Sequence, residues 1–123
     1  IAENRGMIVN VSSISGVLAT STASSLAYGS AKAALIYLTR GLAVALAPNI
    51  RVNAVAPAFT DSKWMQDHYG DDYSETVARA AESYPLGRIA TTEDVAAAIV
   101  SLVTGSDFVT GQTLLIDGGL SLS

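Results

Sequence analysis

The sequence predicts an α/β fold in which three parallel strands are joined by packing helices. Three short runs rich in aliphatic and β-branched residues have the length of buried strands, at residues 7–11, 50–56 and 113–116. Between them lie stretches in which apolar residues recur at three- and four-residue steps, which is the spacing of a helix. Because crossovers between strands of one sheet are right-handed, this order predicts parallel strands.

Composition restricts the class of protein. The chain has 123 residues, enough for one domain at most, and 50% of them are hydrophobic, as in a globular core. The formal net charge of -4 leaves no basic surface, so neither nucleic acid nor an anionic membrane is expected as a partner. There is no cysteine, which excludes thiolate metal sites and is compatible with a cytoplasmic location. No apolar run is long enough to span a bilayer.

The first predicted strand, residues 7–11, leads directly into a cluster of serines. Ser12, Ser13 and Ser15 follow the last apolar residue of the strand. A hydroxyl at the carboxyl end of a parallel strand lies where open α/β sheets bind their ligands. The segment from Ser13 to Ser25 is small and polar, and it is predicted as a loop that lies close to such a ligand or only turns over the surface.

The next element is a helix predicted over residues 26–47, which Pro48 ends. Tyr28 and Lys32 are four residues apart in it, so their side chains share one face. A free tyrosine titrates near about pH 10, and a neighbouring ammonium favours its phenolate. With a serine hydroxyl, this pair could bind a carbonyl oxygen and move a proton to or from it. The alternative is that Tyr28 is a core aromatic residue and that Lys32 is solvated.

Small residues on both faces of this helix leave its packing open. Leu35, Leu38 and Leu42 form one apolar series, and alanines such as Ala34 and Ala45 lie around it. In one interpretation, the sheet covers one face and a second subunit covers the other. In the other interpretation, the helix is a simple core helix of a single chain.

The second strand ends at Pro57, and a loop over residues 58–62 follows at the same end of the sheet as the serines. From there the composition changes, because aromatic and acidic residues gather over residues 63–84. One or two short helices in this segment would form a mobile lid over a pocket, and a solvated helical hairpin is the alternative. His68 and the aspartates near it lack the spacing of metal ligands, so a solvated acidic face is expected rather than a metal site.

The last third of the chain predicts a turn, a helix and a strand. Residues 85–88 have the composition of a turn, and Thr91 or Thr92 provides a hydroxyl that can cap a following helix. Acidic residues just after this cap are favoured by the helix dipole. The helix ends near Gly105, and the strand at residues 113–116 is the third of the sheet.

Six short motifs therefore occur in a fixed order: Ile8-Val9-Asn10-Val11-Ser12-Ser13, Tyr28-Gly29-Ser30-Ala31-Lys32, Asn53-Ala54-Val55-Ala56-Pro57, Pro85-Leu86-Gly87-Arg88, Glu93-Asp94-Val95, and Thr110-Gly111-Gln112 through Asp117-Gly118-Gly119. Together they resemble the carboxyl-terminal half of a short-chain dehydrogenase/reductase, close to the 3-oxoacyl-[acyl-carrier-protein] reductase type. The resemblance runs nearly end to end. It implies that residues 1–123 are part of a doubly wound, Rossmann-like NAD(P)-binding domain, with residues 63–84 as its substrate lid.

The resemblance also implies roles for individual residues. Tyr28 matches the proton donor or acceptor, Lys32 matches the residue that holds the nicotinamide ribose and lowers the tyrosine pKa, and Ser13 matches the hydroxyl that positions the substrate oxygen. Ser15 is the alternative to Ser13, because it lies at the commoner distance from the tyrosine. Cofactor contacts are implied for Tyr28, Lys32, Pro57, Ala58, Phe59, Thr60 and Ser62. The implied reaction is reversible hydride transfer between NAD or NADP and a small-molecule carbonyl or alcohol.

Departures from the family pattern are also present. Pro57-Ala58 stands where the family has Pro-Gly, and Thr60 and Ser62 occupy its usual aliphatic and threonine positions. The glycine-rich loop and the residues that choose between NAD and NADP belong to the family's first half, which has no counterpart here. Since the chain also lacks an initiator methionine, we expect a fragment of a longer, homo-oligomeric reductase, a dimer or a tetramer. The alternative is a non-catalytic fragment or oligomerisation module.

Overall fold

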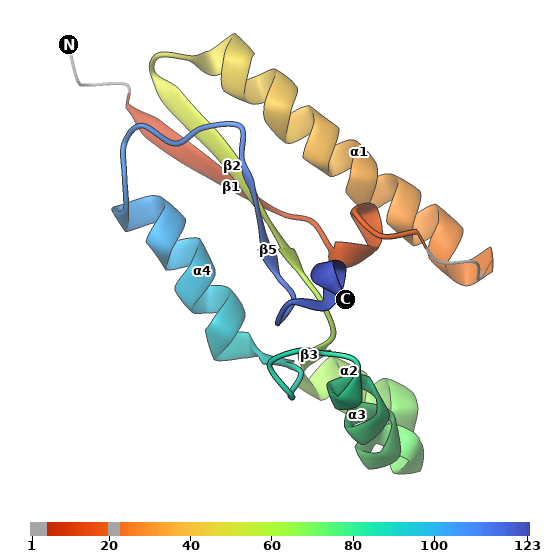
Figure 1. Cartoon of the computed structure of the whole chain (residues 1–123). Coiled ribbons are helices and arrows are strands. Elements are labelled where there is room, and N and C mark those ends of the chain that lie inside the picture. The colour runs from red at the N-terminus through yellow and green to blue at the C-terminus, as the bar shows by residue number, and fades with distance from the viewer. Residues whose placement is uncertain (1–4, 20–22) are drawn as a thin grey trace.

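A computed structural model of the chain describes residues 5–19 and 23–123. The sheet lies between two helices, one on each face, and this arrangement is visible in Figure 1. The strand order is β1-β2-β5 and both pairings are parallel, so the predicted α/β class is confirmed. The strands are β1 (Gly6–Val11), β2 (Ile50–Pro57) and β5 (Thr113–Ile116), and the two flanking helices are α1 (Ala23–Leu46) and α4 (Thr92–Thr104).

The core is centred on the middle strand, β2. Residues 52–56 of this strand are fully buried, because helices cover both faces of the sheet and β2 has a neighbouring strand on each of its two edges. The one polar residue among them, Asn53, has both ends of its amide paired. Its nitrogen donates to the Val109 carbonyl at 3.0 Å, and its oxygen accepts from the Gln112 amide at 3.0 Å. This side chain therefore joins β2 to the segment that leads into β5.

A second buried polar pair joins β1 to α1. Asn10, the polar residue of the first strand, donates from its amide to the Thr39 hydroxyl at 3.0 Å. Thr39 is fully buried, and its hydroxyl donates to the Leu35 carbonyl at 2.8 Å. Both side chains are therefore satisfied, which is the condition for keeping polar groups in a helix–sheet interface.

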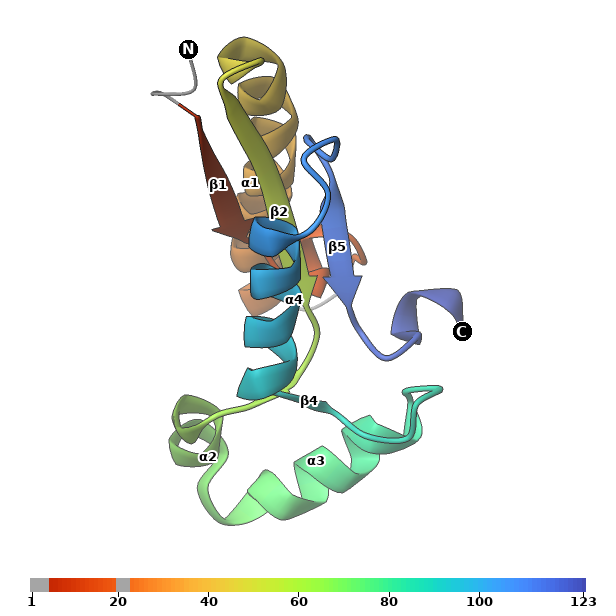
Figure 2. The same ribbon diagram turned by 90° about the vertical axis from the view of Figure 1, so that its left-hand side faces the viewer.

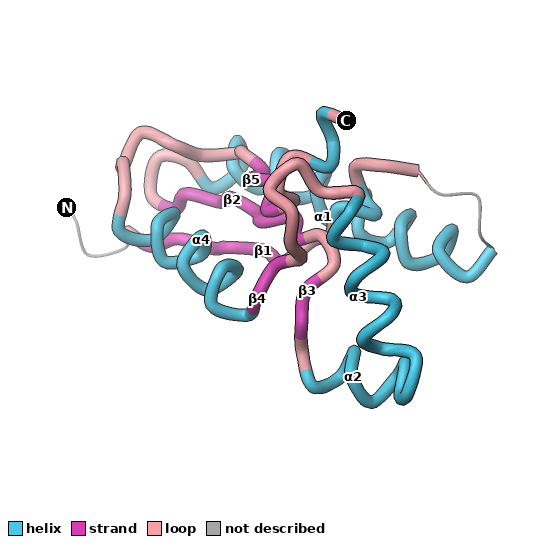
Figure 3. Tube along the Cα trace, turned by 60° about the horizontal axis from the view of Figure 1, so that its bottom comes forward, coloured by secondary structure: helices cyan, strands magenta, loops and turns pink. Residues whose placement is uncertain are grey.

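Three local features differ from the sequence prediction. The predicted loop after β1 contains a short 3₁₀ helix, η2 (Ile14–Gly16), and α1 begins at Ala23 rather than at residue 26. A second, two-stranded sheet pairs β3 (Thr60–Asp61) with β4 (Ala90–Thr91), side by side in Figure 3. Strands of two residues are too short to show an alternating pattern, so sequence periodicity gave no sign of them. Residues 20–22 of the predicted loop lie outside the described residues.

The segment predicted as a lid forms two short helices beyond the carboxyl ends of the strands (Figure 2). Ser62 caps the first of them, because its hydroxyl accepts from the Met65 amide at 3.3 Å. Gly70 follows this helix with a φ of +57°, a conformation that a side chain rarely adopts. The elements are α2 (Lys63–Tyr69), η3 (Gly70–Asp72), α3 (Tyr73–Glu82) and, at the chain end, η4 (Leu120–Leu122).

The amino terminus of α4 is fixed by a capping box. The Thr91 hydroxyl accepts from the Asp94 amide at 3.1 Å, and the Asp94 carboxylate accepts from the Thr91 amide at 2.8 Å. Arg88 donates two hydrogen bonds to the same carboxylate, at 2.6 and 3.2 Å. These contacts join the turn at residues 85–88 to α4. No helix in the described part of the chain is both long and apolar enough to cross a membrane.

The capping box leads to a prediction about pH. The Arg88 guanidinium, and secondly the Thr91 backbone, hold the pKa of Asp94 well below its usual range. The carboxylate therefore stabilises the fold above the unfolded pKa of about 3.9, and this contribution is lost as pH falls toward the lower folded pKa. We expect Asp94→Asn to lower the melting temperature at neutral pH by about 2–5 °C. The difference in melting temperature between the two proteins should be nearly constant above about pH 4 and should shrink as pH falls below it, and a difference that stays constant well below that pH would contradict the assignment.

Candidate active site

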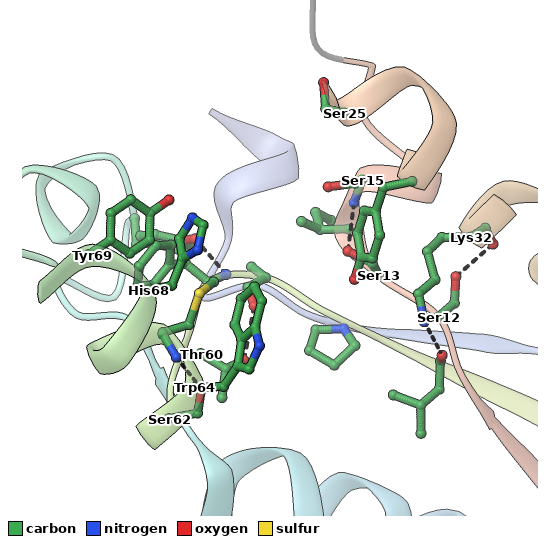
Figure 4. Close-up of a pocket in the computed structure, with 18 residues that line it drawn as sticks. Ser12, Ser13, Ser15, Ser25, Lys32, Thr60, Ser62, Trp64, His68 and Tyr69 are labelled. Carbon is green, nitrogen blue, oxygen red and sulfur yellow. Dashed lines mark hydrogen bonds between the residues drawn. The ribbon is translucent and has the colours of Figure 1, made fainter. Parts of the chain in front are cut away.

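The sequence-predicted site residues come together at one cavity of about 720 Å³. It lies at the carboxyl end of β1 and β2, between α1 and the lid helix α2. Figure 4 shows Ser13, Ser15 and Lys32 on one side of this cavity and lid side chains on the other. The predicted residues that line it are Ser13, Tyr28, Lys32, Pro57, Ala58, Phe59, Thr60 and Ser62, and Ser15 lines it too.

Two glycines allow the serine turn to lie against α1. A Cβ atom on Gly16 would lie 2.7 Å from the Lys32 carbonyl carbon, and a Cβ atom on Gly29 would lie 2.8 Å from the Ser15 carbonyl oxygen. Both distances are shorter than real side chains tolerate, and the obstructing atoms are backbone. The turn that carries Ser13 and Ser15 is therefore in direct backbone contact with the helical turn that carries Tyr28 and Lys32.

The serines are held by hydrogen bonds of their own. The Ser12 amide donates to the Val55 carbonyl at 2.8 Å, which extends the pairing of β1 with β2. Its hydroxyl donates to the Lys32 carbonyl at 2.8 Å. Ser13 is buried, and its hydroxyl accepts from the Ser15 amide at 3.1 Å. That contact orients the Ser13 oxygen and leaves the hydroxyl hydrogen available to a ligand in the cavity.

Tyr28 and Lys32 lie at the cavity as the helical spacing predicted. Tyr28 is 51% exposed, so the alternative that it is a core aromatic residue is wrong. The Lys32 ammonium lies 5.5 Å from the centre of the tyrosine ring. The same ammonium donates to the Val11 carbonyl at 3.1 Å, which fixes it at the end of β1. An ammonium has three hydrogens, so others remain for a ligand in the cavity.

The loop after β2 has its backbone fixed by several different elements. The Ala58 amide donates to the Ile116 carbonyl of β5 at 2.9 Å, and the Phe59 amide donates to the Tyr84 hydroxyl at 3.1 Å. The Thr60 hydroxyl donates back to the Ala58 carbonyl at 2.9 Å. Sequence reasoning placed Tyr84 only at the end of the lid. The residue types around it give no sign of a bond across 25 positions.

The lid side of the cavity is aromatic. Trp64 and His68 are four residues apart in α2, and their rings stack at 5.2 Å with an interplanar angle of 5°. Tyr69 lies edge-on to the His68 ring at 5.0 Å and 6.0 Å from the Phe59 ring. Among the described residues, no group of three or more His, Cys, Asp or Glu side chains is placed to hold a metal. In this structure the His68 ring contacts the rings of Trp64 and Tyr69.

Asp61 joins both lid helices to the segment that precedes them. Its carboxylate accepts from the Tyr73 hydroxyl of α3 and from the Gln66 amide of α2, the latter at 3.1 Å. These two bonds, the tyrosine first, lower the pKa of Asp61. Partial burial and the bond to Asp61 raise the pKa of Tyr73 to about 12. The pair therefore persists as a neutral phenol and a carboxylate over the physiological pH range.

The chemistry of the cavity follows from its donors. Among the residues that the structure describes, Lys32 is the only lysine or arginine that lines it, and no carboxylate does. A serine hydroxyl and the tyrosine phenol can both donate to one carbonyl oxygen, and the phenol can also transfer its proton. The arrangement therefore suits proton transfer at a carbonyl or alcohol oxygen.

Comparisons with known proteins agree with this geometry. A family model described as enoyl-(acyl carrier protein) reductase matches residues 1–121. The chain is 41% identical to 3-oxoacyl-[acyl-carrier-protein] reductase FabG of Thermotoga maritima, over 98% of this chain and 47% of that protein. It is 31% identical to the structure of an oxidoreductase of the short chain dehydrogenase/reductase family from Burkholderia thailandensis, with a TM-score of 0.89 over 99% of this chain and 47% of that chain.

A second similar structure contains a nucleotide. ElxO with NADP bound is 38% identical to this chain, with a TM-score of 0.83, and the match covers 95% of this chain and 47% of ElxO. The chain thus spans about half the length of the curated relatives it matches. For the Thermotoga maritima reductase the share is 47%.

The close contact between the serine turn and α1 leads to a second prediction. Gly29→Ala places a methyl group against the Ser15 carbonyl, so we expect a loss of about 1–3 kcal/mol in the free energy of unfolding. Gly41→Ala is the matched control, because Gly41 is in the same helix and a Cβ atom there meets nothing within 4 Å. This control should gain about 0.5–1 kcal/mol, the helix preference of alanine over glycine. Denaturant unfolding measures both, and equal gains would contradict the close contact.

Proposed function

Because this chain belongs to the short-chain dehydrogenase/reductase family, we propose that it supplies the catalytic half of an NAD(P)-dependent oxidoreductase. The reaction is hydride transfer between a nicotinamide cofactor and the carbonyl or alcohol carbon of a small molecule. The observation that carries the proposal is the convergence of Ser13, Tyr28 and Lys32 on one cavity next to the loop at residues 58–62. The activity is proposed for the whole protein, because relatives such as the Thermotoga maritima reductase are about twice as long as this chain.

The residues at the cavity fit the nicotinamide end of such a cofactor. The Lys32 ammonium, fixed by one bond to Val11, has further hydrogens with which to hold the hydroxyls of a ribose. The Thr60 and Ser62 hydroxyls and the backbone of Pro57, Ala58 and Phe59 line the opposite wall, where the carboxamide and phosphates would be bound. NAD and NADP both satisfy these contacts. The adenosine end of the cofactor would extend beyond these residues.

In the proposed mechanism, this chain manages the proton and the orientation of the substrate. When bound at this cavity, NAD(P)H would supply the hydride that reduces the carbonyl carbon. The Ser13 hydroxyl donates to the carbonyl oxygen and holds it toward Tyr28, which transfers its phenolic proton to that oxygen as the alcohol forms. Lys32, beside the ring of Tyr28, favours the negative charge left on the phenol. Alcohol oxidation is the same sequence in reverse, with Tyr28 accepting the proton.

We further propose that residues 63–84 are the substrate lid. Across the cavity from Ser13, α2 contributes Trp64, Met65, His68 and Tyr69 to the wall. This supports the interpretation of the segment as a lid and disfavours the alternative of a solvated helical hairpin. The indole is 68% exposed, so a substrate would cover apolar surface that water now contacts. An aromatic wall without carboxylates favours substrates with an uncharged, apolar part. This wall is therefore where substrate choice is expected to be made.

The outer face of α1 supports a homo-oligomer, a dimer or a tetramer. Leu38 and Val44 of α1 are 49% and 82% exposed. A second copy of the chain would bury this apolar surface. A cytoplasmic location completes the proposal, since a chain without cysteine suits a reducing compartment.

The decisive variant for this function is Tyr28→Phe in the complete gene product, assayed for NADPH- and NADH-dependent carbonyl reduction. Loss of the proton donor should lower kcat/KM by at least about 100-fold. Fluorescence titration should show that the nucleotide still binds, because Tyr28→Phe keeps the ring. Tyr37→Phe removes a hydroxyl from the exposed side of the same helix and should keep full activity. Equal activity of the Tyr28 variant and the wild type would refute the role of Tyr28.

The choice between the two serines is a separate prediction. We expect Ser13→Ala to lower kcat/KM by at least about tenfold, because the reacting oxygen loses a hydrogen-bond donor. Ser15→Ala should change it little, since only the Ser15 amide, which the variant keeps, is needed to orient Ser13. Melting temperatures of both variants control for a loss of stability when the Ser13 hydroxyl no longer accepts from the Ser15 amide. Full activity without the Ser13 hydroxyl would transfer the role to Ser15.

A further inference from the structure

Tyr84 is a nearly buried tyrosine at the point where the lid segment returns to the sheet. It is 8% exposed, and its ring lies against the turn after β5, where a Cβ atom on Gly118 would be 3.3 Å from the ring. The backbone on either side of the ring is also held. The Gly87 amide donates to the Tyr84 carbonyl at 2.8 Å, and the Leu86 amide donates to the Gly118 carbonyl at 3.1 Å. The phenol is therefore fixed in position by packing and by its own backbone.

The hydroxyl of this fixed phenol accepts from the Phe59 amide at 3.1 Å. Phe59 belongs to residues 58–62, the segment proposed to contact the cofactor. Its carbonyl accepts from the Ala90 amide of β4 at 3.0 Å, and the neighbouring Ala58 amide donates to Ile116 of β5 at 2.9 Å. The peptide groups around Phe59 are thus held by a β4 amide, a β5 carbonyl and one phenol. Without that phenol, the Phe59 amide loses its partner at the cavity wall.

Residues 58–62 are also joined to the rest of the lid. The Asp61 carboxylate accepts from Gln66 of α2 and from Tyr73 of α3. Tyr84 contacts the same segment from the other end of the lid, two residues after α3 ends. The lid is consequently bonded to the cofactor segment near both of its ends. These side chains therefore connect that segment directly to α2 and α3.

We propose that Tyr84 is a positioning residue whose phenol holds the Phe59 amide in the orientation that binds the cofactor, and through which cofactor binding orders the lid. The inference rests on the proposed function, because it assigns the cofactor to residues 58–62. Tyr84 acts through the backbone of Phe59 and needs no contact with the reacting atoms. Phenylalanine at position 84 would preserve the ring against Gly118 and remove only the oxygen, so the role is separable from packing.

The test compares Tyr84→Phe with Tyr37→Phe in the complete gene product, because both lose one hydroxyl and keep the ring. Tyr37 is 77% exposed on α1 and does not line the cavity. NADPH and NADH are titrated by nicotinamide fluorescence. Hydrogen exchange of the α3 amides, residues 73–82, is then measured with and without saturating nucleotide. Saturation removes the effect of weaker binding from the exchange data, so coupling to the lid is read separately from affinity.

For Tyr84→Phe we expect the Kd of the nucleotide to rise about tenfold, the effect of an unpaired amide. The nucleotide should slow α3 exchange in the wild type and in Tyr37→Phe but not in Tyr84→Phe. An unchanged Kd overturns the proposal, including the case in which only the melting temperature falls, since the hydroxyl would then be structural. Equal slowing of α3 in both variants also overturns it. A wild type that binds neither nucleotide contradicts the proposed function itself, and that result is seen before any variant is compared.

Discussion

The backbone contact between the serine turn and α1 is the constraint on which the site depends. Gly16 and Gly29 have no side chains, and only for that reason can the turn after β1 lie against the helix that carries Tyr28 and Lys32. Ser12 strengthens the same contact, because its hydroxyl donates to the Lys32 carbonyl while its amide continues the β1–β2 pairing. The residues that carry the hydroxyl, the phenol and the ammonium are thereby attached to backbone segments in direct contact, as a reaction that positions one oxygen atom requires.

The second half of the site depends on a different kind of contact. The segment at residues 58–62 follows the most deeply buried strand, yet its peptide groups are held by β4, by β5 and by the lid. Two of its hydrogen bonds to residues 63–84 involve phenols. The Asp61 carboxylate accepts from the Tyr73 hydroxyl, and the Phe59 amide donates to the Tyr84 hydroxyl. Residues 63–84 are thus bonded to the segment that lines the cavity, and α2 lines the same cavity. This arrangement gives a physical route by which one bound molecule could prepare the site for another.

Much of the fold could be predicted from the sequence because it depends on local patterns. The three strands are apolar runs of suitable length, and the helix after the serines shows apolar spacing and ends before Pro48. Tyr28 and Lys32 could be paired because helical spacing alone places them on one face. A capping hydroxyl at Thr91 or Thr92, followed by acidic residues, was likewise visible, and the structure assigns the cap to Thr91.

The remainder depends on contacts between distant segments. The β3–β4 pairing joins Thr60–Asp61 to Ala90–Thr91, which lie on either side of residues 63–84 in the sequence. No periodicity marks so short a strand. The bond from Phe59 to Tyr84 and the bond from Tyr73 to Asp61 require the path of the lid to be known. The choice between Ser13 and Ser15 could not be made from spacing, and both serines line the cavity. Substrate identity depends in the same way on the shape of the aromatic wall.

A crystal structure of the complete gene product with NADPH would test the central claim most directly. The account predicts that the nicotinamide ring lies between residues 58–62 and Tyr28, with its ribose hydroxyls on the Lys32 ammonium and with room for a carbonyl oxygen beside Ser13. A nucleotide bound away from this cavity, or a nicotinamide ring separated from Tyr28 by the lid, would contradict it.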